Sequence, residues 1–125
     1  MTDLQAALFQ KAGRAMESAR IALEHGDAET TTNRAYYACF HGARAALLDE
    51  GEQPKTHSGV HNRFAFQFVA SGRISPEVAR TLPHAAQIRE KADYDALAVT
   101  DTRAAADLLA DAERFVEAVR GAVGS

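Results

Sequence analysis

The sequence has little cysteine and no tryptophan: Cys39 is the one thiol among 125 residues. A single cysteine excludes an intramolecular disulfide framework and is typical of a protein from a reducing compartment. The chain also has no basic-then-apolar leader and no apolar run of about 18 residues, so we expect neither export nor a membrane span. Gly-rich phosphate loops, nucleophile elbows and cysteine clusters are absent too. We therefore expect a cytoplasmic protein with no metal or other cofactor.

Positive charge is in short supply as well. Fourteen Lys and Arg residues stand against 17 Asp and Glu, which gives a net charge of -3 and a pI near 5.9. This balance argues against a general electrostatic attachment to DNA or to a membrane surface, but it is compatible with a small local site for RNA or a nucleotide. Val and Ile are few and alanine is abundant, which favours close-packed helices over a sheet. The length suits a single domain over residues 1–125.

Apolar periodicity and helix-end signals divide the chain into five helices. Gly26 is placed to end the first helix, and the Ser75-Pro76 pair is a strong start signal for the fourth, in which Pro83 predicts a bend. The alternating Phe residues of the third segment also fit a strand, but the sequence offers no partner strand. The predicted fold is all-α, a five-helix and mostly up-and-down bundle, with helices over about 3–24, 28–50, 60–70, 76–92 and 101–123.

The second predicted helix has two useful faces. Its apolar stripe is expected to face the core and consists of Thr32, Tyr36, Cys39, Ala43, Ala46 and Leu47. A neighbouring face repeats the same spacing with Arg34, Tyr37, His41, Arg44 and Leu48. Arginine, tyrosine and histidine on consecutive turns exceed what packing requires, so this helix is the first place to expect function.

Three motifs occur in order along the chain. The first runs from Asn33 through Tyr36-Tyr37 to His41 and continues into Ala45-Ala46-Leu47-Leu48; the others are His57-Ser58-Gly59 with the later Phe68-Val69 and Ser71-Gly72, and Arg89-Glu90-Lys91-Ala92-Asp93-Tyr94. Together they resemble the HEPN domains of bacteria and archaea, small helical proteins named for higher eukaryotes and prokaryotes nucleotide-binding. The resemblance covers essentially the whole chain and implies a five-helix bundle of HEPN type.

The resemblance also implies a function. Many HEPN members are metal-independent ribonucleases or toxins, often encoded beside a small nucleotidyltransferase that acts as antitoxin. Their signature is an Arg followed four to six residues later by His, usually near the fourth helix, and two protomers bring these motifs together in a homodimer cleft. The Arg would stabilise the charged phosphorane and the His would move the 2′-hydroxyl proton.

This sequence departs from that signature at the fourth helix. Arg89 stands where the family's Arg is expected, but Asp93 and Tyr94 follow it in place of a His. The one Arg-x6-His pair is Arg34 and His41 on the second helix. Seven residues advance a helix by about 10 Å, which is long for cooperation on one phosphate within a protomer. We therefore expect Arg34 and His41 to act as a composite catalytic pair across a homodimer axis.

Other residues are candidates for substrate binding or support of this site: Tyr37, His57, Arg89, Asp93 and Tyr94. Tyr37 can stack on a base or fill a seam, and His57, near a helix start, can contact an anion. Tyr94 is the nearest match to the tyrosine that the nucleotidyltransferase of related pairs adenylylates. His57 and His61 have two-His metal spacing without a third ligand, so no metal is expected.

Structural readings of the same residues remain open. Arg34 can form an ion pair with Asp93 or Glu90, and Arg89 with Asp93 and Tyr94 can be a polar clamp that holds the fourth helix to the second. Two functional hypotheses follow. In the first, the chain is a toxin–antitoxin type endoribonuclease that acts on RNA; in the second, it is a non-catalytic module that binds a nucleotide or docks a nucleotidyltransferase.

Overall fold

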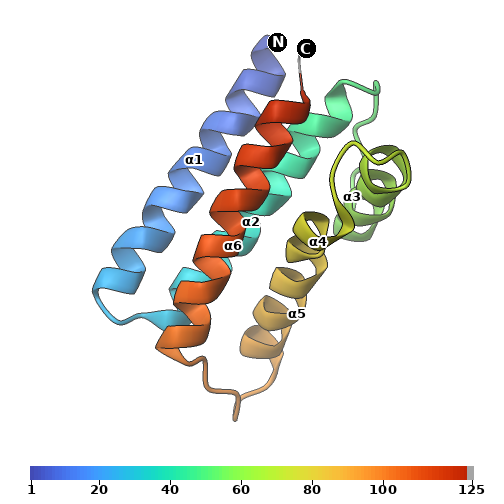
Figure 1. The fold of residues 1–125 in the computed structure, drawn as a ribbon. Coiled ribbons are helices and arrows are strands. Elements are labelled where there is room, and N and C mark those ends of the chain that lie inside the picture. The colour runs from blue at the N-terminus through green and yellow to red at the C-terminus, as the bar shows by residue number, and fades with distance from the viewer. Residues whose placement is uncertain (124–125) are drawn as a thin grey trace.

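The computed structural model describes residues 1–123, and all regular structure within them is helical (Figure 1). The predicted all-α fold of five helices is confirmed. More than five elements carry labels, because a π-helical turn extends the third predicted helix and a one-residue break divides the fourth. The elements are α1 (Asp3–Glu24), α2 (Ala28–Leu48), α3 (His57–Phe64), the π-turn η1 (Ala65–Val69), α4 (Pro76–Ala79), α5 (Thr81–Tyr94) and α6 (Thr102–Ala122).

Helices α1 and α2 form an antiparallel hairpin. Thr2 caps α1 by accepting a hydrogen bond from the backbone N–H of Gln5, and Asp27 caps α2. Between them Gly26 has a φ of 73°, the left-handed conformation that ends helices and that glycine adopts without strain. At the other end of the hairpin the Gln5 side chain donates a hydrogen bond of 2.9 Å to the carbonyl of Ala45, which fixes the position of one helix along the axis of the other.

Helix α2 is the centre of the bundle and packs against α1, α3, α5 and α6. Figure 1 shows α6 in front of it, with α1 and α5 on either side. The predicted apolar stripe is confirmed, because all six of its members are buried: Thr32, Tyr36, Cys39, Ala43, Ala46 and Leu47. The helix that carries the candidate site is therefore held rigidly on most of its circumference.

Two details differ from the sequence-based expectations. The break in the fourth helix lies at Arg80, not at Pro83, because proline lacks the N–H that would bond to the carbonyl of Ala79. The helical spacing of Leu4 and Leu8 also predicts that both lie on the buried side of the first helix, but Leu4 is 47% exposed. None of the described helices combines the length and apolar content that crossing a membrane requires.

Candidate functional site

The polar face of α2 lies beside its buried stripe. Arg34, Tyr37, His41, Arg44 and Leu48 are all half-buried, as a set of residues repeating every three to four positions must be when it borders the core. Two other helices, α3 and α5, pack on α2 and bring their side chains to this face.

The ring of Tyr37 is the point where these helices meet. The guanidinium carbons of Arg34 and Arg89 lie 5.1 and 5.7 Å from its centroid. The imidazoles of His41 and His57 lie 6.1 and 6.0 Å from it, centre to centre. Four of the residues that the sequence singled out thus surround the phenol ring of a fifth, and we call these five residues the Tyr37 cluster.

Arg34 carries a charge that no described carboxylate neutralises. Its Nε and Nη2 both donate to Oδ1 of the neighbouring Asn33, at 3.0 and 2.8 Å. The ion pair considered for it with Asp93 or Glu90 does not form. The Asn33 amide orients the guanidinium without cancelling its charge, which leaves the group suited to an anion.

Arg89 enters the cluster from α5. Its Nη1 donates to Oδ2 of Asp93 at 2.9 Å, one turn further along the same helix, and its guanidinium lies over the rings of Tyr36 and Tyr37. Asp93 lies on α5 like Arg89, so the ion pair does not connect two helices. The contact that holds α5 to α2 is the cation–π contact of Arg89 with the two tyrosines. The Nε atom of Arg89 is buried and has no hydrogen-bond partner among the described residues.

His41 is the second residue with such an atom, its Nδ1. Burial lowers the pKa of His41 to about 4, and the positive charges of Arg44, Lys11, Arg34 and Arg14 contribute in the same direction. The imidazole is therefore neutral at pH 7 and can accept a proton. Unsatisfied buried polar atoms are rare in folded proteins, and here both belong to predicted site residues.

The Tyr36 hydroxyl joins one further histidine, His61, to His57 of the cluster. The Tyr36 oxygen lies 2.8 Å from Nδ1 of His57 and 3.2 Å from Nε2 of His61. Burial lowers the pKa of both imidazoles. Sequence reasoning assigns Tyr36 to the apolar stripe that faces the core and misses this role. The spacing of four between His57 and His61 does place both on one helix face, which was the available signal.

Tyr94 lies outside the cluster. It is the last residue of α5, and its side chain is 83% exposed. Cys39, by contrast, is fully buried, and burial raises the pKa of its thiol, so it is not available as a nucleophile. No group of three potential metal-ligating side chains occurs in residues 1–123.

A second Arg–His pair with family-like spacing is unsuited to chemistry. Arg20 and His25 are five positions apart, but Arg20 is bound to Glu17 and Glu113. The Nδ1 atom of His25 lies 2.9 Å from the carbonyl of Ile21, in its own helix. Both residues are used in surface contacts of the first helix.

Comparison with known proteins settles the family. The family model described as HEPN domain matches residues 5–122. The chain belongs to the HEPN family. The resemblance found in the three sequence motifs is confirmed by this match, which covers nearly all of the chain.

Relatives of this HEPN domain occur in archaea and bacteria. One, from Methanocaldococcus jannaschii, carries the name putative toxin and is 34% identical over 117 residues, which cover 94% of this chain and 87% of that protein. A UPF0332 protein of Gloeobacter violaceus is 33% identical over 118 residues, 94% of each chain.

A solved structure supports the fold. The structure titled as that of a toxin–antitoxin with AMP-PNP superposes with a TM-score of 0.64 over 95% of this chain and 99% of that one. The sequence identity is 14%, so the likeness concerns the arrangement of helices.

Proposed function

We propose that this HEPN domain is the toxin of a toxin–antitoxin pair and cleaves RNA without a metal at the Tyr37 cluster. The observation that carries the proposal is the convergence of two guanidiniums and two imidazoles on the ring of Tyr37. The toxin names of two archaeal relatives and the toxin–antitoxin title of a structural neighbour support the biological setting.

The chemistry uses the 2′-hydroxyl of the RNA as nucleophile. Neutral His41 accepts the proton of that hydroxyl while its oxygen bonds to phosphorus, and the bond from phosphorus to the 5′-oxygen breaks. Arg34 and Arg89 stabilise the negative charge that grows on the phosphorane oxygens. The departing 5′-oxygen takes a proton from water, so the products are a 2′,3′-cyclic phosphate and a 5′-hydroxyl.

In this proposal, binding of the RNA substrate raises the low pKa of His41. Four cations hold its pKa down together with burial, and a bound phosphodiester brings a negative charge among them. That charge offsets the repulsion that disfavours protonation, so the pKa of His41 rises towards neutrality when RNA is bound. The base is therefore strengthened at the moment it is needed.

The homodimer remains part of the proposal. Arg34 and His41 are about 10 Å apart along α2, so one phosphate reaches both more easily when a second protomer doubles each residue. The alanine-rich composition of α2 suggests a surface for self-association, but its alanines are buried within the bundle, so the proposed interface lies on other residues. Light scattering of the purified chain tests the dimer directly.

Metal-free cleavage of a mixed RNA pool in excess chelator tests the activity. Wild type is compared with Arg34→Ala, His41→Ala and Arg89→Ala, and with Arg103→Ala, an exposed arginine at the start of α6, as control. We expect cyclic-phosphate ends from wild type and the control, with loss in the three cluster variants. A folded wild-type protein that leaves RNA intact would overturn the nuclease.

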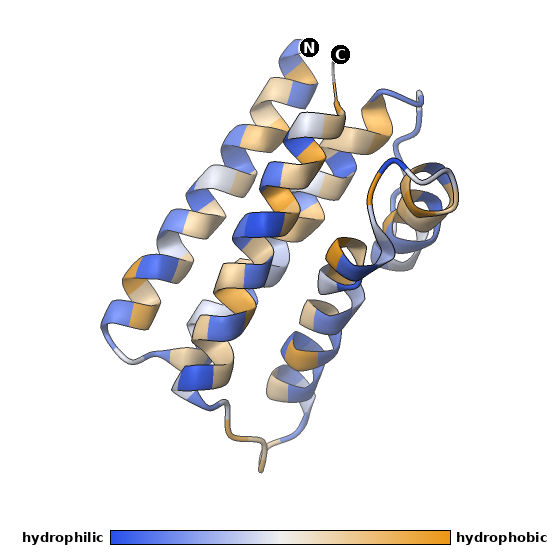
Figure 2. Cartoon of the chain, viewed as in Figure 1, coloured by the Kyte–Doolittle hydropathy of each residue, from blue (hydrophilic) through white to orange (hydrophobic). Residues whose placement is uncertain are grey.

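One observation favours the docking module as a second candidate. Tyr94, Leu97 and Val99, in or beside the α5–α6 connector, are 83, 90 and 92% exposed, and Figure 2 shows hydrophobic residues in this connector. Exposed apolar clusters mark protein contacts. A nucleotidyltransferase partner docked here would find the Tyr94 hydroxyl accessible for adenylylation. Leu97→Asp is then expected to abolish co-purification with the nucleotidyltransferase, while wild type and variant alike leave RNA intact.

A further inference from the structure

Four cations surround His41 on the α1–α2 hairpin. Lys11 and Arg14 lie one turn apart on α1 and are exposed, and Arg34 and Arg44 lie on either side of His41 along α2. The antiparallel pairing of the two helices brings both pairs to the same region. None of the groups that shift the pKa of His41 is an acid. We call Lys11, Arg14, Arg34 and Arg44 the basic strip.

The four cations of the basic strip have no carboxylate partner among residues 1–123, although acidic residues outnumber basic ones in the chain. Lys11, Arg14 and Arg44 form no ion pair with any residue in 1–123, and Arg34 bonds to the neutral amide of Asn33. Carboxylates do neutralise a set of arginines elsewhere in the bundle: Arg20, Arg63, Arg73, Arg89 and Arg114. Four positive charges without a carboxylate partner thus gather at one location, which favours a polyanionic ligand there.

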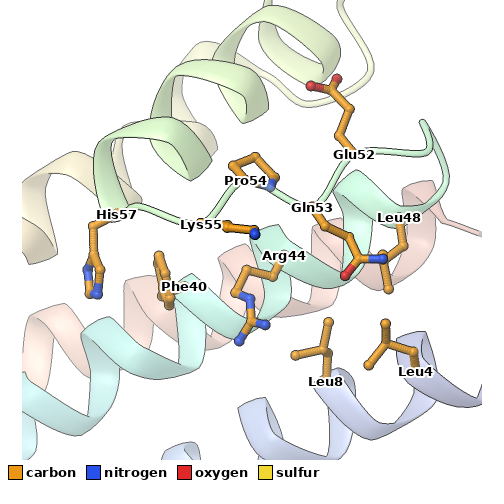
Figure 3. Close-up of a pocket in the computed structure, with 10 residues that line it drawn as sticks. All are labelled: Leu4, Leu8, Phe40, Arg44, Leu48, Glu52, Gln53, Pro54, Lys55 and His57. Atoms are coloured by element: carbon orange, nitrogen blue, oxygen red, sulfur yellow. The ribbon is translucent and has the colours of Figure 1, made fainter.

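A groove continues the strip beside the Tyr37 cluster, and His57 of that cluster is one of the residues that line it. It lies between α1, α2 and the loop before α3, with a volume of about 460 Å³. Figure 3 shows Arg44 between Phe40 and Leu8, with Leu48 further along α2 and Lys55 facing them from the loop. The groove thus combines an apolar floor with two cations.

The one acid of the groove lining does not oppose an anion. The carboxylate of Glu52 accepts hydrogen bonds from the Arg63 guanidinium and from the Gln67 amide. The negative charge of Glu52 is therefore compensated by side chains of α3 and η1. Arg44 and Lys55 then determine the electrostatic potential of the groove.

We propose that the basic strip and this groove bind single-stranded RNA, with the strip along the phosphates and the groove around a flanking base. The inference rests on the proposed function, because it names the substrate that the Tyr37 cluster receives. A splayed base fits a half-open pocket with Phe40 and leucines in its lining, whereas a duplex keeps its bases stacked inside. Single-strand sites combine a basic track with apolar and aromatic contacts in this way.

Fluorescence anisotropy with a labelled single-stranded RNA of about ten nucleotides tests the strip. The variant is Lys11→Glu/Arg14→Glu, which reverses two exposed charges on α1 without touching the Tyr37 cluster. The matched control is Arg80→Glu/Arg103→Glu, the same change in net charge at two exposed arginines of α4–α5 and α6. Circular dichroism and thermal unfolding confirm that both variants keep the fold.

We expect the strip variant to weaken RNA binding at least about tenfold and the control to weaken it less than about threefold. For wild type, log K against log salt has an expected slope of about -2 to -3, the value for three or four neutralised phosphates of a single strand. Equal loss in both variants, or none in the strip variant, would overturn the inference and leave the strip to another ligand such as an acidic protein. Binding through the strip without any cleavage would leave the inference standing and remove the nuclease.

Discussion

The phenol oxygen of Tyr36 lies 2.8 Å from Nδ1 of His57, and the same oxygen lies 3.2 Å from Nε2 of His61. Burial raises the pKa of Tyr36 to about 12, so the hydroxyl keeps its proton at neutral pH. One proton can serve one histidine only, so the phenol donates to one ring and accepts from the N–H of the other. The tautomers of His57 and His61 are thereby coupled.

Replacing this hydroxyl tests the coupling. Tyr36→Phe keeps the ring and its stacking but leaves both histidines without their partner. Because both rings reach solvent, water recovers part of the loss, and we expect the free energy of unfolding to fall by about 1 kcal/mol in a urea titration.

The control for that variant is the neighbouring ring. Tyr37→Phe removes a hydroxyl with no hydrogen bond to any described residue, so its expected change is below about 0.5 kcal/mol. NMR titration adds a second readout, because the pKa values of His57 and His61 are expected to move in Tyr36→Phe alone. Equal effects of the two variants would contradict the coupling.

Arg89 can be tested by a substitution that keeps its charge. A lysine in its place lacks the planar group that lies over Tyr36 and Tyr37 and bonds to Asp93. We expect Arg89→Lys to slow single-turnover RNA cleavage by about 10²-fold, the scale of losing one donor to a developing oxyanion. Arg103→Lys is the matched control, and a wild-type rate in Arg89→Lys would show that charge alone suffices.

The sequence predicted most of the fold because helix signals are local. The stripe from Thr32 to Leu47 is buried as predicted, and Gly26 ends the first helix as expected. The helical spacing of Leu4 and Leu8 predicts that both face inward, but in the first turn of α1 the bundle no longer covers Leu4.

The candidate site was only partly predictable. Arg34, Tyr37 and His41 share a face because of helical spacing, which a sequence displays directly. The contacts of Tyr36 with His57 and His61 join residues more than 20 positions apart, and only the packing of α3 on α2 determines them. Tyr94 is the last residue of α5 and is exposed, beyond the part of the helix that packs on the bundle.

Two glycines with equal space around them are expected to respond oppositely to alanine. A Cβ at Gly13 or at Gly26 meets nothing within 4 Å, but Gly26 has a φ of 73° and Gly13 lies inside α1. Gly13→Ala should raise the free energy of unfolding by about 0.5–1 kcal/mol through helix propensity. Gly26→Ala should lower it by about 1 kcal/mol through left-handed strain. Urea unfolding of both variants decides, and the same sign for both would contradict the assignment of backbone conformation.

His41 predicts how stability depends on acidity. Its pKa is lowered from about 6.5 in the unfolded chain to about 4 in the folded protein, so the unfolded chain binds the proton first as the pH falls. The free energy of unfolding therefore declines between pH 6.5 and 4 through this group, by about 1–2 kcal/mol once the half-exposed ring is allowed its hydration. Carboxylates titrate in the lower part of the same range, so the informative quantity is the difference between wild type and His41→Gln, which cannot take up the proton. We expect the plots of unfolding free energy against pH for the two proteins to converge as the pH falls from 7 to 4. Parallel plots would show that folding does not lower the pKa of His41.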